Sequence, residues 1–420
     1  MVATSRHGVF YGWWVLAASV GAVALASGVS FWSFGLYVEP LEDEFGWSRA
    51  AVAGGFSVSL LVSGLSGPLV GRWADRSGPR RVIFFGAVLT AASYVLLWAT
   101  GSLWQWYVFL SVNGLFRQFM LFIPFQALIS RWFERRRGLA VGILGVGFSL
   151  GGFVVVPVMR VVIDEMGWDG SFLFSAVAIA LYFILISAFV LRNAPADVGE
   201  YTDGVQAPAS AGAGALELPG LTLGEAVRTP FFWVIAIALM FFFYGMFGML
   251  VHLVPFYESV GVSRVTAAVL VSAAAGLGMI SRLVQGVYAD RINRMEIGAM
   301  GLILALAAAM TVLLVDSGPA GIGVFIALWV IGSGGGPLLE PLLLPKAFGL
   351  AHFGAILGTV GVVETAGLIA SPTIAGAMYD ATGSYDLVLA MLIVTFSISF
   401  VLFWVASRMP LPIEQMRRAV

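Results

Sequence analysis

The stretch Gly71–Arg76 reads Gly-Arg-Trp-Ala-Asp-Arg, and the stretch Gly286–Arg291 repeats its outline as Gly-Val-Tyr-Ala-Asp-Arg. The aspartates of the two stretches, Asp75 and Asp290, are separated by about half the length of the chain. A second related pair, Gly138–Gly142 and Gly354–Gly358, has almost the same offset. A chain that resembles itself at half its length predicts two structural halves with the same fold.

The composition places most of this chain in a lipid bilayer. Hydrophobic residues make up 60% of the sequence and charged residues 11%, with a mean hydropathy of +0.96, whereas a soluble protein carries about 25% charged residues. The formal net charge is −1, so no basic field recruits nucleic acid. The absence of cysteine excludes disulfides, thiolate metal sites and a cysteine nucleophile.

Twelve segments are long and apolar enough to cross a bilayer as helices, which takes about 20 residues each, and they predict an all-α membrane protein. The first segment is longer than the apolar core of a cleaved signal peptide, about 7–15 residues, so we expect it to remain as the first span. The predicted spans lie near residues 11–36, 49–70, 82–100, 105–129, 138–162, 171–191, 230–256, 265–288, 296–315, 321–345, 354–378 and 386–407.

A polar stretch with several Pro, Gly and Ser residues, 193–229, separates the sixth predicted span from the seventh. We expect residues 1–192 and 230–420 each to form a six-helix bundle, with 193–229 as a cytoplasmic linker. Of the 22 Lys and Arg residues, 17 fall on one side of these spans. By the positive-inside rule, that side and both termini face the cytoplasm. We expect the protein to lie in the inner membrane of the cell.

The loop sequence Gly71–Arg81 matches the G-x-x-x-D-R-x-G-x-R-R motif of the major facilitator superfamily, and essentially the whole chain resembles that family. Within the superfamily it looks most like the monocarboxylate porter branch, which includes the oxalate/formate antiporters. Residues Trp132–Gly142 resemble that branch's signature around span five, and Tyr11–Val15 resemble its first signature more loosely. The resemblance implies two bundles that rock about a central site, with spans one, four, seven and ten lining the cavity.

Two departures from this branch concern the coupling of transport to protons. Gly278 and Trp32 stand where some animal members carry an aspartate and a lysine, so that proton-coupling pair is not carried over. Glu364 stands where the oxalate/formate antiporters carry a lysine, which weakens the case for oxalate/formate exchange. Arg282, in contrast, matches the branch's substrate-anchoring arginine on span eight.

The loop motifs supply the predicted gating residues. The resemblance implies that they form a charge network between neighbouring helix ends, and that this network holds one access state closed. They indicate membership of the superfamily and carry no information on the substrate. The predicted gating residues are Asp75, Arg76, Arg80, Asp290 and Arg291.

Arg282 is the predicted substrate anchor. An ionised side chain near the bilayer centre costs roughly 2.5–3.5 kcal/mol or more, so it needs a partner or a function. Its counterpart in the first half is Gly67, so this charge belongs to one half only, as expected of function rather than of the shared scaffold. A guanidinium binds a carboxylate through two parallel hydrogen bonds. The alternative is a structural ion pair with Glu364 or Glu340.

Arg117 is the second predicted anion-binding residue. It lies near the middle of span four, with Asn113 one turn away on the same face. A second arginine in the cavity suits a dicarboxylate or a substrate with another polar acceptor. The alternative is neutralisation by an acidic residue of span ten or eleven. Trp32 and Tyr244 are expected to shape the pocket, although an aromatic belt or plain packing explains them almost as well.

Glu364 is the predicted proton carrier, and its counterpart in the first half is the apolar Phe148. A carboxyl group placed between a desolvating environment and a nearby arginine can take up and release a proton as substrate comes and goes. A static ion pair is the alternative. Glu340, between Pro337 and Pro341, is the weaker candidate, and the two prolines predict a broken helix at a gate.

The leading hypothesis is a secondary carrier of small organic anions, in the first place proton-coupled symport of a lactate- or pyruvate-like monocarboxylate by alternating access. The second is a proton-independent anion exchanger or dicarboxylate transporter, and a non-transporting membrane sensor is a remote third. No enzyme, metal-site or nucleotide-binding motif occurs in the sequence, so we expect no catalytic residues and no cofactor. The expected partners are the anion, a proton and the bilayer, with a monomer as the functional unit.

Overall fold

A computed structural model describes residues 9–204, 220–292 and 294–419, and these residues are almost entirely helical. Residues 1–8 of the predicted first bundle and 205–219 of the predicted linker lie outside the described residues. The helices of the first half are α1 (Gly12–Ser30), η1 (Trp32–Tyr37), α2 (Val38–Phe45), α3 (Arg49–Ser77), α4 (Pro79–Trp98), α5 (Leu103–Arg117), η2 (Gln118–Met120), α6 (Phe122–Trp132), α7 (Arg137–Leu150), the π-helix η3 (Gly151–Val155) and α8 (Val156–Phe189).

The second half follows two short 3₁₀ turns and one short helix. These three elements are η4 (Pro195–Val198), η5 (Thr202–Gly204) and α9 (Leu223–Ala226). The remaining helices are α10 (Pro230–Ser259), α11 (Arg264–Ala289), α12 (Met295–Val315), α13 (Pro319–Phe348), α14 (Phe353–Thr382), α15 (Asp386–Arg408) and α16 (Pro412–Ala419).

The helices confirm a membrane protein with twelve crossings. Among the described residues, eleven continuous helical stretches are long and apolar enough to span a bilayer, and one of them, Arg137–Phe189, has 53 residues. That stretch bends at Gly167, whose φ of 78° and ψ of 167° are not helical. Only glycine adopts such a backbone without strain, so Gly167 divides the stretch into the predicted fifth and sixth spans.

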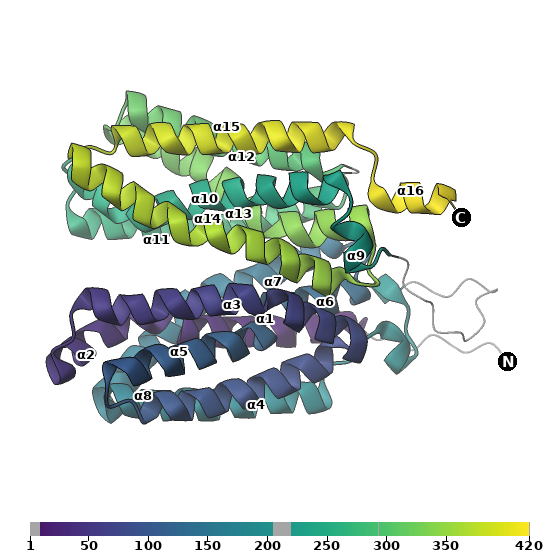
Figure 1. Cartoon of the computed structure of the whole chain (residues 1–420), viewed down its shortest axis with the longest axis horizontal. Helices are drawn as coiled ribbons and strands as arrows, with labels where there is room; N and C mark the ends of the chain where they lie inside the picture. The colour runs from purple at the N-terminus through teal and green to yellow at the C-terminus, as the bar shows by residue number, and fades with distance from the viewer. Residues whose placement is uncertain (1–8, 205–219, 293, 420) are drawn as a thin grey trace.

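The helices form two groups that lie side by side along the length of the molecule. Figure 1 shows α1 to α8 in the lower group and α10 to α15 in the upper group. The short helix α2 lies at one end, and α9 and α16 lie at the other, which also carries the loops around Asp75, Arg135 and Asp290. We call this second end the arginine-rich end.

The internal repeat of the sequence is visible in local structure. Ser48 caps the start of α3 by accepting a hydrogen bond from a backbone N–H, and Ser263, at the same offset as the loop aspartates, caps the start of α11 in the same way. The next residues, Arg49 and Arg264, form ion pairs with Glu42 and Glu258 respectively. Because these pairs are exposed they add little stability, about 0–1 kcal/mol each, but they show that both halves use the same local design.

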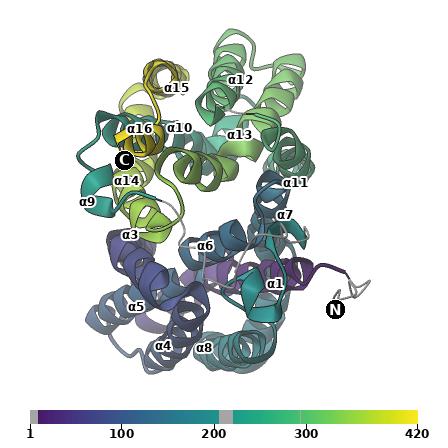
Figure 2. The same cartoon turned by 90° about the vertical axis from the view of Figure 1, so that its right-hand side faces the viewer.

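The two groups touch along two pairs of helices near the arginine-rich end. Figure 2 shows α3 against α14 and α7 against α11. A Cβ atom added to Gly67 of α3 would lie 2.7 Å from the carbonyl oxygen of Gly358 on α14, and one added to Gly286 of α11 would lie 2.5 Å from that of Gly138 on α7. Small residues are therefore required where the backbones of the two halves meet.

Helix α13 corrects one expectation from the sequence. A broken helix was predicted at Pro337 and Pro341, and this prediction is wrong, since α13 runs as one α-helix from Pro319 to Phe348. A proline removes one backbone hydrogen bond and does not have to end a membrane helix, because neighbouring helices and side chains can satisfy the freed groups. Glu340 therefore lies on a continuous helix.

Candidate functional site: two latches and a central arginine

Two aspartates of the loop motifs fasten the two halves to each other. Asp75 of α3 accepts hydrogen bonds from the backbone N–H groups of Gly354 (2.9 Å) and Ala355 (2.8 Å), at the start of α14. A helix N-terminus carries unpaired N–H groups and a partial positive charge, so it is a favourable site for a carboxylate. We call this contact the Asp75 latch.

The Asp290 latch is the counterpart in the other half. Asp290, directly after α11, accepts hydrogen bonds from the backbone N–H groups of Gly138 (2.5 Å) and Leu139 (3.2 Å), at the start of α7. The two latches cross between the halves in opposite directions. Each hydrogen bond to a charged group contributes about 1.5–3 kcal/mol, so together the latches favour a closed arginine-rich end.

Burial raises the pKa of the Asp290 carboxyl, and the nearby carboxylate of Asp203 acts in the same direction. The N–H groups of Gly138 and Leu139 and the ammonium of Lys346 lower this pKa, but they do not outweigh the burial. The ionised carboxylate is therefore less stable in this contact than in water.

The arginines of the two loop motifs make contacts within their own halves. Arg80 donates from Nε to the carbonyl of Ser187 (2.6 Å), near the end of α8. The guanidinium of Arg291 lies 5.8 Å from the ring centre of Tyr288. Arg76, Arg80 and Arg291 take part in none of the four ion pairs found among the described residues. The two aspartates of these motifs thus accept hydrogen bonds from the N–H groups at helix starts, and no ion pair joins them to these arginines among the described residues.

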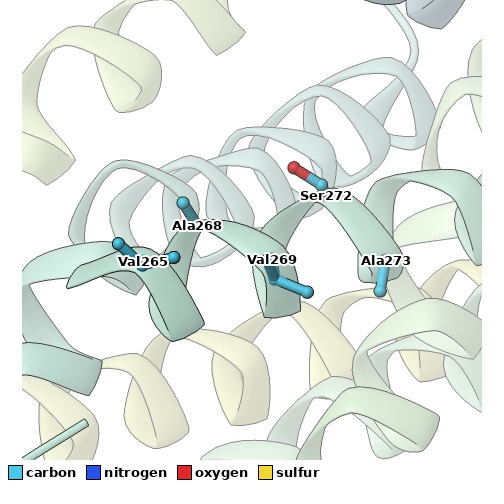
Figure 3. Close-up of a pocket in the computed structure, with 5 residues that line it drawn as sticks. All are labelled: Val265, Ala268, Val269, Ser272 and Ala273. Carbon is cyan, nitrogen blue, oxygen red and sulfur yellow. The ribbon is translucent and has the colours of Figure 1, made fainter. Parts of the chain in front are cut away.

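A shallow cavity, wide open to the surface and lined by this helix alone, lies along the first half of α11, at the end opposite the latches. Its volume is about 620 Å³, and Figure 3 shows the five side chains that line it along one face of this helix. The lining holds no charged side chain; it consists of Val265, Ala268, Val269, Ser272 and Ala273. The same helix is therefore open to a cavity at its start and in contact with α7 at its end.

Arg282 lies on α11 between the cavity and the Asp290 latch. Its Nη1 donates to the carbonyl of Gly145 (2.7 Å) and to Oγ of Ser149 (3.3 Å), both on α7 of the other half. Its Nε donates to the carbonyl of Gly334 on α13 (3.4 Å). A Cβ atom added to Gly278, one turn earlier, would meet no atom within 4 Å. The guanidinium thus bridges the two halves beside free space.

The hydrogen-bond partners of Arg282 in the described part of the chain include no carboxylate. The residue takes part in none of the ion pairs within 9–204, 220–292 and 294–419, so the pairing with Glu364 or Glu340 that the sequence left open is not formed in this structure. All three acceptors of the guanidinium are neutral groups. None of these hydrogen-bond partners therefore neutralises the positive charge of the guanidinium.

Arg117 has different surroundings. It is 3% exposed and donates to the carbonyl of Ser30 on α1 (3.2 Å), while its guanidinium lies 5.9 Å from the ring centre of Phe56 on α3. Asn113, also buried, donates to Oγ of Ser93 on α4 (3.0 Å). Both side chains point into the first half, and neither forms an ion pair in the described part of the chain.

The two aromatic candidates lie apart from each other. Trp32 donates from Nε1 to the carbonyl of Phe148 on α7 (2.8 Å) and is 38% exposed. The hydroxyl of Tyr244 on α10 donates to the sulfur of Met391 on α15 (3.4 Å), so this side chain points into the second half. Trp32 therefore contacts α7 one residue before Ser149, a hydrogen-bond partner of Arg282, whereas Tyr244 contacts α15.

Glu364 and Glu340 meet each other instead of an arginine. Glu340 on α13 and Glu364 on α14 are direct neighbours whose carboxyl groups interact. Glu364 is 6% exposed, and its Oε1 has no hydrogen-bond partner in the described part of the chain. Glu340 lies less than two turns beyond Gly334, the α13 contact of Arg282, which is about 9 Å along the helix. Arg282 and the Glu340–Glu364 pair thus lie in the same half, at neighbouring heights along helix α13.

A comparison with family models decides how this arrangement is classified. The model of the Major Facilitator Superfamily matches residues 20–351. The chain belongs to this superfamily. Its members are transporters and not enzymes, so the chain is a multi-pass membrane transporter.

Curated relatives place the chain near the monocarboxylate transporters of the superfamily. It is 27% identical to the oxalate:formate antiporter of Oxalobacter formigenes, over 81% of this chain and 78% of that protein. It is 26% identical to monocarboxylate transporter 13 of Bos taurus (89% and 84% covered) and 28% identical to monocarboxylate transporter 11 of Homo sapiens (89% and 79% covered). The chain is therefore a monocarboxylate-transporter-like member of the superfamily.

Solved structures agree on the fold. The human organic anion transporter MFSD10 aligns with a TM-score of 0.67 at 16% identity, covering 93% of this chain and 99% of that one. The transporter FucP in its outward conformation aligns with a TM-score of 0.69 at 13% identity, covering 94% and 99%. These likenesses confirm the twelve-helix facilitator architecture.

The sequence analysis missed the groups that the latch aspartates bind. Backbone N–H groups have no signature of their own, although the second internal repeat, at Gly138 and Gly354, marks the positions where they lie. Among the residues that the structure describes, no group of three or more His, Cys, Asp or Glu side chains is arranged to hold a metal ion.

Proposed function

We propose that this facilitator carries small organic anions, in the first place a monocarboxylate together with a proton, and that Arg282 binds the carboxylate. The observation that carries the proposal is the position of Arg282, which lies between the two halves and binds only neutral acceptors. A carboxylate is a stronger acceptor for a guanidinium than a carbonyl or hydroxyl, because it carries a full negative charge and can accept two parallel hydrogen bonds from the fork. A substrate carboxylate can therefore replace the α7 contacts.

Replacement of these contacts would connect binding to movement. Gly145 and Ser149 belong to α7 in the first half, whereas Arg282 belongs to the second half. A ligand that takes over the guanidinium changes the contact between the halves, and only such differential contact can shift a conformational equilibrium. In this proposal the structure represents the form that is closed at the arginine-rich end and open at the α11 cavity.

The Glu340–Glu364 pair is the proposed proton site. Two carboxylates in contact cannot both ionise at modest cost, so they hold one proton between them. The pair lies in the same half as Arg282, on helices α13 and α14, and α13 also contacts Arg282 through Gly334. A substrate anion near Arg282 and a proton on the pair would together cross the membrane as a neutral load.

Arg117 has an indirect part in this proposal. It is buried without a carboxylate partner in the described part of the chain, so its charge contributes a positive potential to the first half and favours anions. Trp32 and Phe148 would form an apolar wall, and Asn113 and Tyr244 would support their own bundles. We further propose that the arginine-rich end faces the cytoplasm, in the cell membrane, and that a monomer is sufficient.

A second candidate function is proton-independent exchange of anions or dicarboxylate transport. Two observations favour it: one relative is an oxalate:formate antiporter, and a second embedded arginine lacks a carboxylate partner among the described residues. In that case Arg117 would become available to a second carboxylate when the halves move. A dicarboxylate that binds more tightly than its monocarboxylate analogue would support this candidate.

A binding screen tests the proposal. The purified protein is heated with lactate, pyruvate, formate, acetate, oxalate and succinate, each at pH 5.5 and pH 7.5, with glucose and choline as neutral and cationic controls. We expect stabilisation by one or more monocarboxylates, which is lost in Arg282→Gln and weakened in Arg282→Lys, where the charge remains but the fork is absent. Equal stabilisation of Arg282→Gln and the parent protein would refute the assignment of the anchor.

A further inference from the structure

The segment 193–204 contacts the loop between α6 and α7 through one carboxylate. Asp203 accepts backbone N–H hydrogen bonds from Glu134 (3.1 Å) and Arg135 (2.6 Å) with Oδ2, and from Arg136 (3.4 Å) with Oδ1. These are three consecutive donors, which a loop would otherwise offer to water. One side chain therefore fixes the path of this loop.

The same loop leads directly into the Asp290 latch. Helix α7 begins at Arg137, and the next two N–H groups, of Gly138 and Leu139, bind Asp290 of the second half. Asp203 thus holds the N–H groups just before Arg137, and Asp290 holds those just after it. Because the two sets of donors are neighbours on one backbone, the position of the first set determines where the second set points.

The backbone of Asp203 adopts a conformation that few residues other than glycine adopt, although aspartate tolerates it better than most. Its φ of 59° lies in the left-handed region, and it is the one non-glycine residue with a positive φ among the described residues. Such a conformation is costly for a residue with a Cβ atom and persists where several contacts require it. The three hydrogen bonds to the α6–α7 loop are such contacts.

The rest of the segment is fixed to the first half as well. Glu200 accepts a hydrogen bond from the backbone N–H of Tyr11 (3.0 Å), and the side chain of Asn193 accepts one from the backbone N–H of Arg80 (3.0 Å). Asp203 is therefore held by its neighbours at a defined place. The segment that carries Asp203 is thus itself hydrogen-bonded to the first half.

The second half has a related contact at the corresponding place. The backbone N–H of Leu221 donates to the carbonyl of Phe348 (2.8 Å), and Gly220 pairs with Gly349, shortly before α14. Helix α14 carries the N–H groups that bind Asp75. In each half, a contact with the connection between the halves thus precedes the latch helix. Among the described residues, the first half makes this contact through a side chain and the second half through its backbone.

We infer that Asp203 is a positioning residue of the transport cycle, which holds the α6–α7 loop so that Gly138 and Leu139 present their N–H groups to Asp290. This inference rests on the proposed alternating-access function, since it assigns the latch to one of its two forms. Loss of the Asp203 carboxylate weakens the Asp290 latch and shifts the protein away from the form closed at the arginine-rich end.

The test uses reporters in a chain that has no cysteine of its own. One reporter is Ser272→Cys, in the lining of the α11 cavity, whose reaction rate with a water-soluble maleimide measures opening at that end. The other is a pair of spin labels at Arg81→Cys and Ile297→Cys, exposed positions in opposite halves near the arginine-rich end. Both are measured on the full chain in lipid nanodiscs, without substrate.

Asp203→Asn is compared with Asp197→Asn, a matched control in the same segment. Asp197 accepts hydrogen bonds only from Asn193 and Ala194, within the segment itself. We expect Asp203→Asn to lower the labelling rate at Ser272→Cys at least two-fold and to lengthen the spin-label distance, with Asp197→Asn unchanged. Asp290→Asn should shift both reporters in the same direction, and the double variant should add little to it.

A shift with Asp290→Asn but none with Asp203→Asn would overturn the role of Asp203. No shift with either variant would overturn the gating role of the latch and the inference with it. An equal shift with Asp197→Asn would show a general effect of the segment's charge and also overturn the inference. Failure of the parent protein to bind any anion would count against the proposed substrate alone, because these reporters need no ligand.

Discussion

The surroundings of Arg117 and Arg282 differ in a way that separates their roles. Each half of the molecule holds one of these arginines within a predicted span, Arg117 buried and Arg282 partly buried, and neither has a carboxylate partner among the described residues. The contacts of Arg117, to Ser30 and Phe56, all lie within the first half. Arg282 instead donates across the boundary, to Gly145 and Ser149.

The consequence concerns movement of one half against the other. A rigid rotation of the halves leaves the contacts of Arg117 intact, and it breaks the two that Arg282 makes to α7 while keeping the one to Gly334. Only a group whose contacts change between two forms can connect ligand binding to that change. Arg282 can therefore couple ligand binding to the movement of the halves, because its contacts change. Arg117 keeps its contacts and acts as a fixed positive charge.

The largest predicted effect comes from removing each arginine in turn. Arg282→Gln should lower uptake of a monocarboxylate into proteoliposomes about 100-fold or more, since two hydrogen bonds to a charged group contribute about 1.5–3 kcal/mol each. Arg117→Gln, the matched change in the other half, should lower it less than about 10-fold, because it removes only a more distant charge. Equal losses in both variants would abolish the distinction between the two arginines.

The second prediction concerns the carboxyl pair beside Arg282, which the first half lacks. Glu364→Gln should remove the stimulation of uptake by an acidic outside medium, while exchange of labelled for unlabelled anion continues near the parent rate, because the anion site remains. Glu340→Gln should reduce the stimulation less, since the buried Glu364 remains able to take up a proton. Uptake by Glu364→Gln that still follows the pH gradient would rule out this pair as the proton site.

The smallest effect is expected from adding a methyl group where the backbones of the two halves meet. A Cβ atom at Gly67 would lie 2.7 Å from the carbonyl of Gly358, so the backbones of α3 and α14 are in close contact there, whereas Gly361, one turn along α14, has no atom within 4 Å of such a Cβ. We expect Gly358→Ala to lower uptake a few-fold by loosening the closed form, and Gly361→Ala to leave it unchanged. Identical rates for the two variants would show that this contact does not limit transport.

Much of the architecture could be predicted from the sequence because its signals are local. Hydropathy over about 20 residues reports a span regardless of its neighbours, and all twelve spans appear where the sequence placed them. The repeat also related Asp75 to Asp290 as equivalent positions of the two halves. The groups that each aspartate binds could not be predicted, because every residue but proline has a backbone N–H and the sequence does not mark the ones that act as donors.

The partners of the embedded charges could not be predicted. Helix α13 is apolar on every side, so its sequence does not indicate which way Glu340 points. The pairing of Glu340 with Glu364, rather than of Glu364 with Arg282, depends on how α13 and α14 are rotated about their axes. Such rotation is set by packing between helices that are distant in sequence.

An experimental structure with a bound monocarboxylate tests the central claim most directly. The account predicts a carboxylate oxygen about 2.7–2.9 Å from the guanidinium nitrogens of Arg282, with the hydrogen bond from Arg282 to Gly145 broken and Arg117 still on Ser30. A carboxylate bound at Arg117, with Arg282 still donating to Gly145, would contradict it.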